Sequence, residues 1–167
     1  MNGNLSAGLS SGQVVCFDTA PLIYFIEEHP VYLPILKNIF GEVSKNEIHG
    51  IASHLALIEV LVKPLQAGAY DIAARYRDIL LCGALKMCPL EEKIAEKAAR
   101  IKAVYGIKTP DAIHVATAIC GNADIFITND KRLRAVKEIK VLMLDDFVPS
   151  TKPKRGAIAS FLHRLFG

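Results

Sequence analysis

The feature that most constrains the fold is a regular alternation of short apolar runs with longer segments of helical periodicity. The apolar runs are QVVCF (13–17), HGIAS (49–53), ALKMC (84–88), DIFITN (124–129) and KVLML (140–144). Helical periodicity covers 21–28, 32–45, 55–63, 69–81, 89–106, 109–121 and 130–138. Runs that are apolar on both faces need helices on both sides, which predicts a parallel five-stranded sheet in a three-layer α/β/α sandwich.

Two acidic residues stand directly after predicted strands. Asp18 ends the first strand, and Asp130 follows the apolar part of the fourth. Right-handed crossovers bring the carboxyl ends of parallel strands to one edge of the sheet, where open α/β sheets bind their ligands. We therefore expect Asp18 and Asp130 to lie close together in space.

Two further acids lie on predicted helices. In KTPDAIHV, Thr109 suits the N-cap and Pro110 the first helical position, so Asp111 falls in the first turn, where the helix dipole favours a negative charge. Asp111 could equally be an ordinary acid at a helix start. Glu59 interrupts the apolar helix LALIEVLV and needs a partner or a metal to offset its desolvation. An ion pair with Lys63, one turn later, is the simpler explanation.

The contexts of these four acids resemble the PIN domain nucleases and, within them, the VapC-type toxins of toxin–antitoxin pairs. The segments FDTAPLIYF, ALIEVLVKP, TPDAIHVATA and FITNDKRL follow the family order, and the resemblance spans 14–147. It implies a metal-dependent ribonuclease that acts on RNA, an antitoxin partner and a homodimer. It further implies that Asp18, Glu59, Asp111 and Asp130 are catalytic, with Thr19 and Thr128 as polar neighbours that line the pocket.

The chemistry of phosphodiester hydrolysis agrees with this set of residues. The reaction needs an activated water and neutralisation of charge on the phosphate oxygens, which Mg²⁺ or Mn²⁺ held by oxygen ligands can supply. Asp18, Asp111 and Asp130 are the expected metal ligands, and Glu59 could bind a second ion or orient the water. If the four carboxylates are crowded together, their repulsion should raise some of their pKa values.

Neighbouring residues leave alternatives open. Lys131 and Arg132, at the presumed mouth of the cleft, could contact RNA phosphates or form a solvated helix start. His114 is expected to support the structure or a neighbouring side chain rather than to act in catalysis. The chain has no GxGxxG, Walker-type or HExxH motif, and Ala20 stands where a haloacid dehalogenase-type phosphotransferase needs a second aspartate.

Composition and termini set the domain organisation. With 51% hydrophobic residues in 167, one domain is expected over 13–148. Residues 1–12 are interpreted as a flexible leader. Residues 149–167 form a basic tail in which Ile158, Phe161, Leu162 and Leu165 share one helical face and suit docking on protein. The four cysteines show no CxxC spacing, which favours reduced thiols.

The sequence also bears on location and on rival functions. No apolar run has the roughly 18 residues that span a bilayer, and the N-terminus lacks a signal-peptide pattern, so a cytoplasmic protein with no membrane contact is expected. The principal rival is a PIN-like protein without catalysis that binds RNA or serves as a scaffold. A free-standing RNA-processing nuclease is the alternative among enzymes.

Overall fold

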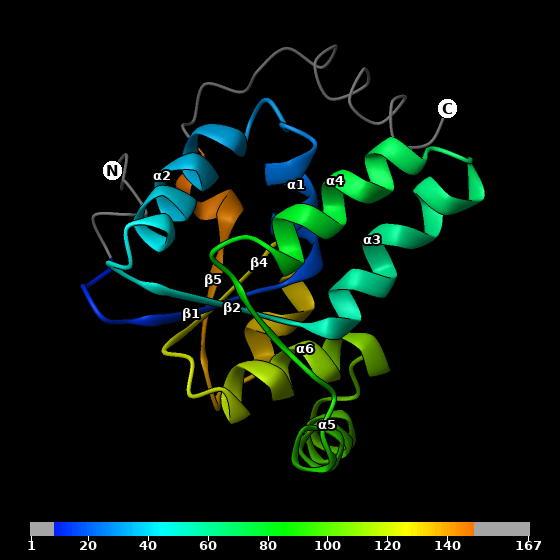
Figure 1. The fold of residues 1–167 in the computed structure, drawn as a ribbon. Coiled ribbons are helices and arrows are strands. Elements are labelled where there is room, and N and C mark those ends of the chain that lie inside the picture. The colour runs from blue at the N-terminus through cyan, green and yellow to red at the C-terminus, as the bar shows by residue number, and fades with distance from the viewer. Residues whose placement is uncertain (1–8, 149–167) are drawn as a thin grey trace.

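The protein folds around a five-stranded sheet in which every neighbouring pair of strands is parallel (Figure 1). The structure is a computed structural model and describes residues 9–148. The strands are β1 (Val14–Phe17), β2 (His49–Ser53), β3 (Lys86–Cys88), β4 (Ile125–Thr128) and β5 (Lys140–Met143). Their order is β3-β2-β1-β4-β5. The first three strands extend from β1 toward one edge of the sheet, and β4 and β5 extend from the other side of β1, so the strand order reverses between β1 and β4.

Helices cover both faces of the sheet, as the continuous apolar strands predict. One face carries α1 (Thr19–Ile26), α2 (Leu33–Ser44), α3 (His54–Gln66) and α4 (Tyr70–Leu81), and the other carries α5 (Glu92–Tyr105) and α6 (Thr109–Cys120) (Figure 1). Two short 3₁₀ helices, η2 (Lys131–Ala135) and η3 (Leu144–Phe147), follow β4 and β5. The predicted three-layer α/β/α sandwich is confirmed.

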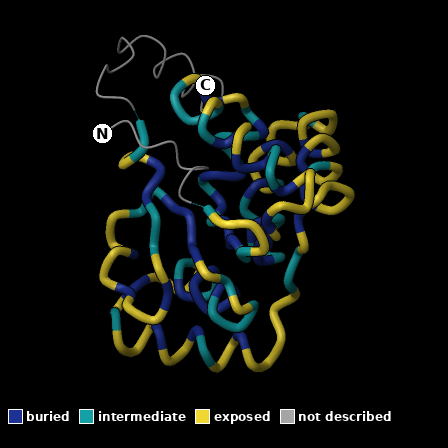
Figure 2. Tube along the Cα trace, turned by 90° about the vertical axis from the view of Figure 1, so that its left-hand side faces the viewer, coloured by how far each residue is buried: buried dark blue, intermediate teal, exposed yellow. Residues whose placement is uncertain are grey.

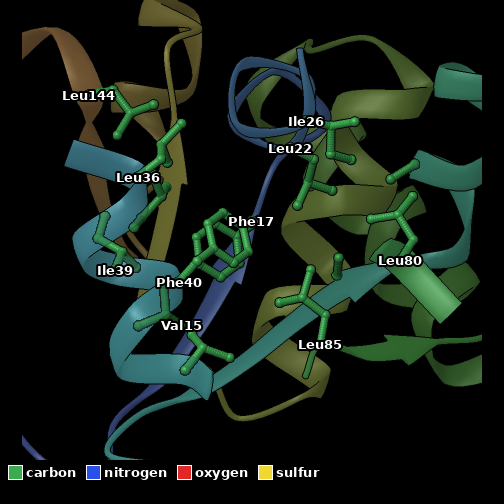
Figure 3. Packing of buried hydrophobic residues seen from close by; sticks show 14 of the residues in the cluster. Val15, Phe17, Leu22, Ile26, Leu36, Ile39, Phe40, Leu80, Leu85 and Leu144 are labelled. Carbon is green, nitrogen blue, oxygen red and sulfur yellow. The ribbon is translucent and has the colours of Figure 1, made fainter. Parts of the chain in front are cut away.

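Alternate side chains of β1 enter two separate cores. Val15 and Phe17 belong to the core beneath α1–α4, whereas Cys16 belongs to the core beneath α5 and α6. In the first core Phe17 stacks on Phe40 of α2 with ring centroids 4.8 Å apart (Figure 3). Phe25 of α1 stacks on the same Phe40 ring. The three central strands β1, β2 and β4 are largely buried, whereas the edge strands β3 and β5 are more accessible. Much of the remaining exposure lies on the outer turns of the helices and on the loops (Figure 2).

Three local expectations differ from the structure. The segment after Asp130 is a five-residue 3₁₀ helix and not a helix over 130–138. Lys108 is the N-cap of α6 and its side chain does not cap the helix, so Thr109 is already helical. Helix α3 continues through Pro64 to Gln66 and does not end at Lys63. Pro64 is buried on the same side of the helix as Ala56 and Val60.

The structure describes only part of the predicted terminal segments. In the leader, Gly12 N donates to Glu47 O at 2.7 Å and Leu9 packs against the core, while residues 1–8 lie outside the described part. The basic tail predicted at 149–167 also lies outside the described residues. Within residues 9–148, none of the helices has the length and apolar character that a membrane crossing requires.

Candidate active site

Asp18 and Asp130 meet at the carboxyl edge of β1 and β4. The backbone N–H of Asp18 donates to Ile127 O at 3.0 Å, which fixes Asp18 at the end of the ladder between the two strands. Its carboxylate caps α1 by accepting from Thr19 N at 2.8 Å and accepts from Thr128 Oγ1 at 2.6 Å. Thr128 Oγ1 in turn accepts from Asp130 N at 3.0 Å. One hydroxyl therefore links the two acids.

Arg132 joins Asp130 to Asp111. Asp130 caps η2 by accepting from Arg132 N at 2.9 Å, which turns the Arg132 side chain back toward the same carboxylate. The guanidinium donates from Nε to both Asp130 oxygens, at 2.9 and 3.0 Å, and from Nη2 to Asp130 Oδ2. Nη2 also lies 3.2 Å from Asp111 Oδ2, in the first turn of α6. The three aspartates thus belong to one connected network.

The pKa values of these carboxyl groups show that they lie within each other's electric field. Burial raises the pKa of Asp111, and the negative charges of Asp130 and Asp18 raise it further against the opposing effect of Arg132. The hydrogen bonds from Arg132 lower the pKa of Asp130. Burial is therefore the main cause of the raised pKa of Asp111 and the expected crowding adds to it, whereas at Asp130 the hydrogen bonds from the guanidinium outweigh burial and lower the pKa.

Glu59 is held in a different way. Its Oε2 accepts from Thr19 Oγ1 and lies 2.9 Å from His114 Nε2, which must donate because a carboxylate can only accept. His114 is 2% exposed, and its Nδ1 has no hydrogen-bond partner within the described part of the chain. Burial alone would raise the pKa of Glu59, but the hydrogen bonds from His114 and Thr19 lower it overall. Thr19 connects this group to Asp18 through the adjacent backbone.

The four acids therefore form two linked groups and not a single converging cage. Within residues 9–148, no three or more His, Cys, Asp and Glu side chains are arranged to hold one metal ion as they stand. The donor chemistry of the three aspartates nevertheless fits a hard divalent cation, since carboxylate oxygens are its preferred ligands. A positive group, the Arg132 guanidinium, already lies between Asp111 and Asp130.

The remaining predicted residues divide by role. Thr19 and Thr128 use their hydroxyls to hold Glu59 and Asp18, so in this structure they position carboxylates. Lys131 is exposed at the start of η2. Sequence reasoning did not identify Tyr24 as a residue near the candidate site. Its pKa is raised by burial and by the charges of Asp145 and Asp18, and its hydroxyl forms a hydrogen bond with Asn129. The position of Asn129 directly before Asp130 was the available signal.

The family model of the PIN domain matches residues 15–139. This chain belongs to the PIN domain family. No curated protein matches it.

Three solved structures with a similar fold come from VapBC or toxin–antitoxin complexes. VapBC2 from Rickettsia felis, bound to a DNA fragment from its promoter, aligns with a TM-score of 0.65 at 17% identity over 78% of this chain and 98% of that chain. A toxin–antitoxin complex from Klebsiella pneumoniae gives 0.61 at 22% identity, over 78% and 97%. DNA-bound VapBC from Salmonella typhimurium gives 0.56 at 14%, over 79% and 98%. At these identities the likeness establishes the fold.

Proposed function

We propose that this PIN domain protein is a divalent-metal-dependent endoribonuclease that cleaves single-stranded RNA, and that it is the toxin of a toxin–antitoxin pair. The observation that carries the proposal is the hydrogen-bonded network that joins Asp18, Asp111 and Asp130 at the carboxyl edge of the sheet. In a PIN domain this edge is a suitable position for hydrolysis of a phosphodiester, because carboxylates from three elements meet beside the point where strand order reverses.

The proposed ligands of Mg²⁺ or Mn²⁺ are Asp18, Asp111 and Asp130. Such an ion would activate water and neutralise charge that builds on the phosphate oxygens. Thr128 fixes the orientation of Asp18, and the backbone N–H groups of Thr19 and Arg132 hold one oxygen each of Asp18 and Asp130. These contacts hold ligands in place before an ion binds, which reduces the entropy lost on binding.

Glu59 is proposed to orient the attacking water. Thr19 and His114 both donate to Oε2, so Oε1 is the oxygen proposed to contact the water. A carboxylate whose rotamer is fixed by two donors and whose pKa is lowered stays ionised and can accept a proton or a hydrogen bond from water. Lys131 and Arg132 are the proposed contacts to RNA phosphates.

Two protein partners are proposed, an antitoxin and a second copy of the chain. Three solved structures with a similar fold are VapBC or toxin–antitoxin complexes, which supports the first. Apolar side chains on the outer faces of α3 and α4 support protein contacts in general, since a set this large is unusual on a monomer surface. They are Ile58, Val62, Leu65, Tyr70, Ile72 and Leu81.

Light scattering after size exclusion tests the dimer. Co-purification of a short protein encoded by a neighbouring gene tests the antitoxin. A cytoplasmic location follows from the proposed RNA substrate.

The enzymatic proposal is tested by a metal-titrated cleavage assay on labelled structured and unstructured RNAs. Cleavage should require Mg²⁺ or Mn²⁺, stop with a chelator and favour unpaired segments. RNA binding without cleavage at any metal concentration would support the rival scaffold function. Cleavage of defined sites in the chain's own host transcripts, with no growth arrest on expression and no neutralising partner, would support a free-standing processing nuclease.

A further inference from the structure

Arg132 is the cationic side chain most closely engaged with the candidate metal ligands in the described residues. Both oxygens of Asp130 accept from its guanidinium, and Nη2 also reaches Asp111 Oδ2 at 3.2 Å. The neighbouring Arg134 provides a contrast within the same short helix. Its Nη2 pairs with Asp146 Oδ1 at 2.7 Å, and Asp146 is not one of the proposed ligands.

The guanidinium and a divalent ion would need the same oxygen atoms. An ion on Asp130 must bind Oδ1 or Oδ2, and Arg132 uses both. An ion that bridges Asp130 and Asp111 would also face the positive charge of Arg132 at a few ångströms, where two like charges repel. Occupation of these carboxylates by both cations at once is therefore disfavoured by charge repulsion.

In the absence of an ion, Arg132 keeps the two acids together. Arg132 Nη2 contacts both Asp111 Oδ2 and Asp130 Oδ2, so the two carboxylates lie close to one nitrogen and their negative charges repel each other. A planar guanidinium can bond two carboxylates at once, which neutralises part of this repulsion. Its side chain is 54% exposed, so the pairing is screened by solvent and can be broken at modest cost.

We propose that Arg132 is an internal counter-ion that competes with the divalent cation for Asp111 and Asp130, so that the guanidinium must leave these carboxylates when an ion binds. The inference rests on the proposed function and deepens it. It assigns Arg132 a positioning role that sets the metal affinity of the site. Arg132 also holds the ligands near each other until an ion replaces it.

The test is Mn²⁺ binding by the full chain in the absence of RNA, measured by isothermal titration calorimetry. Arg132→Ala should tighten Mn²⁺ binding by about three- to fivefold, the upper size expected for loss of a competing ion pair at an exposed position. Arg134→Ala removes the same charge from the same helix and should change the affinity less than about twofold. Equal or weaker binding by Arg132→Ala, or equal tightening by both variants, would overturn the proposal.

A second readout follows the side chain itself. In an NMR titration with diamagnetic Mg²⁺, the Arg132 Nε–H resonance should shift in step with metal binding, while that of Arg134 stays in place. A bound ion that leaves the Arg132 resonance unmoved would also overturn the proposal.

The two proposals fail in different ways. If the wild-type protein binds Mn²⁺ and Arg132→Ala binds it no more tightly, competition fails while the nuclease remains possible. If metal binds competitively but no RNA is cut, the competition stands and the nuclease fails. If neither the wild type nor Arg132→Ala binds Mn²⁺ at millimolar concentration, both fail.

Discussion

At the scale of single residues, the position of Glu59 depends on a histidine that is almost fully buried. His114 lies on α6 and Glu59 on α3, on opposite faces of the sheet, and their 2.9 Å contact passes beside the end of β1 where Thr19 begins α1. The contact with His114 affects the pKa of Glu59. Burial raises this pKa, and the donors His114 and Thr19 outweigh burial.

We predict that His114→Leu raises the pKa of Glu59, because it removes the Nε2 donor that stabilises the ionised carboxylate while burial persists. The carboxyl ¹³C chemical shift of Glu59 as a function of pH measures this directly. Thr117→Val is the matched control, since Thr117 is buried on the same helix but donates to Ile113 O at 2.8 Å. A Glu59 pKa that is unchanged in His114→Leu, or moved equally in the control, would show that His114 does not stabilise the carboxylate.

At the scale of elements, α6 approaches β2 closely enough to require a glycine. A Cβ on Gly121, the C-cap of α6, would lie 2.6 Å from Ile51 Cδ1 and 2.9 Å from the backbone oxygen of Thr117. The second of these contacts cannot be relieved by a rotamer change. Helix α6 carries Asp111 at its other end, so this packing also fixes the position of the acid.

We predict that Gly121→Ala lowers the free energy of unfolding by about 1–3 kcal/mol, as expected for overpacking against backbone. Gly41→Ala is the control, because a Cβ there meets no atom within 4 Å in the middle of α2. It should stabilise the protein by about 0.5–1 kcal/mol through helix propensity. Chemical denaturation measures both. Destabilisation of the same size in both variants would exclude the packing explanation.

The elements that the sequence predicts well are those set by continuous local patterns. The first strand is an example, since VVCF is apolar on both faces and can only lie in the centre of a covered sheet. The segment after Asp130 was predicted less well. Its apolar spacing fits an α-helix, but Leu133 alone is buried within η2, and Asp130 bonds both the backbone and the side chain of Arg132, which tightens the turn to a 3₁₀ helix.

The candidate site was predicted in part for a similar reason. Topology alone brings Asp18 next to Asp130, because β1 and β4 are adjacent and parallel. The pairing of Arg132 with Asp111 joins residues on α6 and η2 and depends on how far a side chain reaches, which the sequence does not encode locally. The sequence predicts a supporting role for His114, but not that its partner is Glu59, because the 2.9 Å contact passes beside the end of β1 and joins helices far apart in the sequence.

At the scale of the whole molecule, the three aspartates of the candidate site and the exposed apolar side chains lie on different elements. Asp18 and Asp130 lie at the carboxyl ends of β1 and β4 and Asp111 lies on α6, whereas the exposed apolar side chains lie on α3 and α4. Glu59 lies on α3 beside the exposed Ile58, so a protein bound to α3 and α4 would come close to one end of the candidate site.

The measurement that tests the central claim most directly is cleavage of labelled single-stranded RNA by Asp18→Asn in Mn²⁺. Asparagine keeps the capping acceptor of α1, so the fold should be retained and its circular dichroism unchanged. The exposed Asp78→Asn on α4 removes the same charge and serves as control. We predict that Asp18→Asn loses at least about 100-fold in rate, since a ligand charge is removed, while Asp78→Asn keeps wild-type activity. Wild-type cleavage by Asp18→Asn, in a preparation free of other nucleases, would contradict the account.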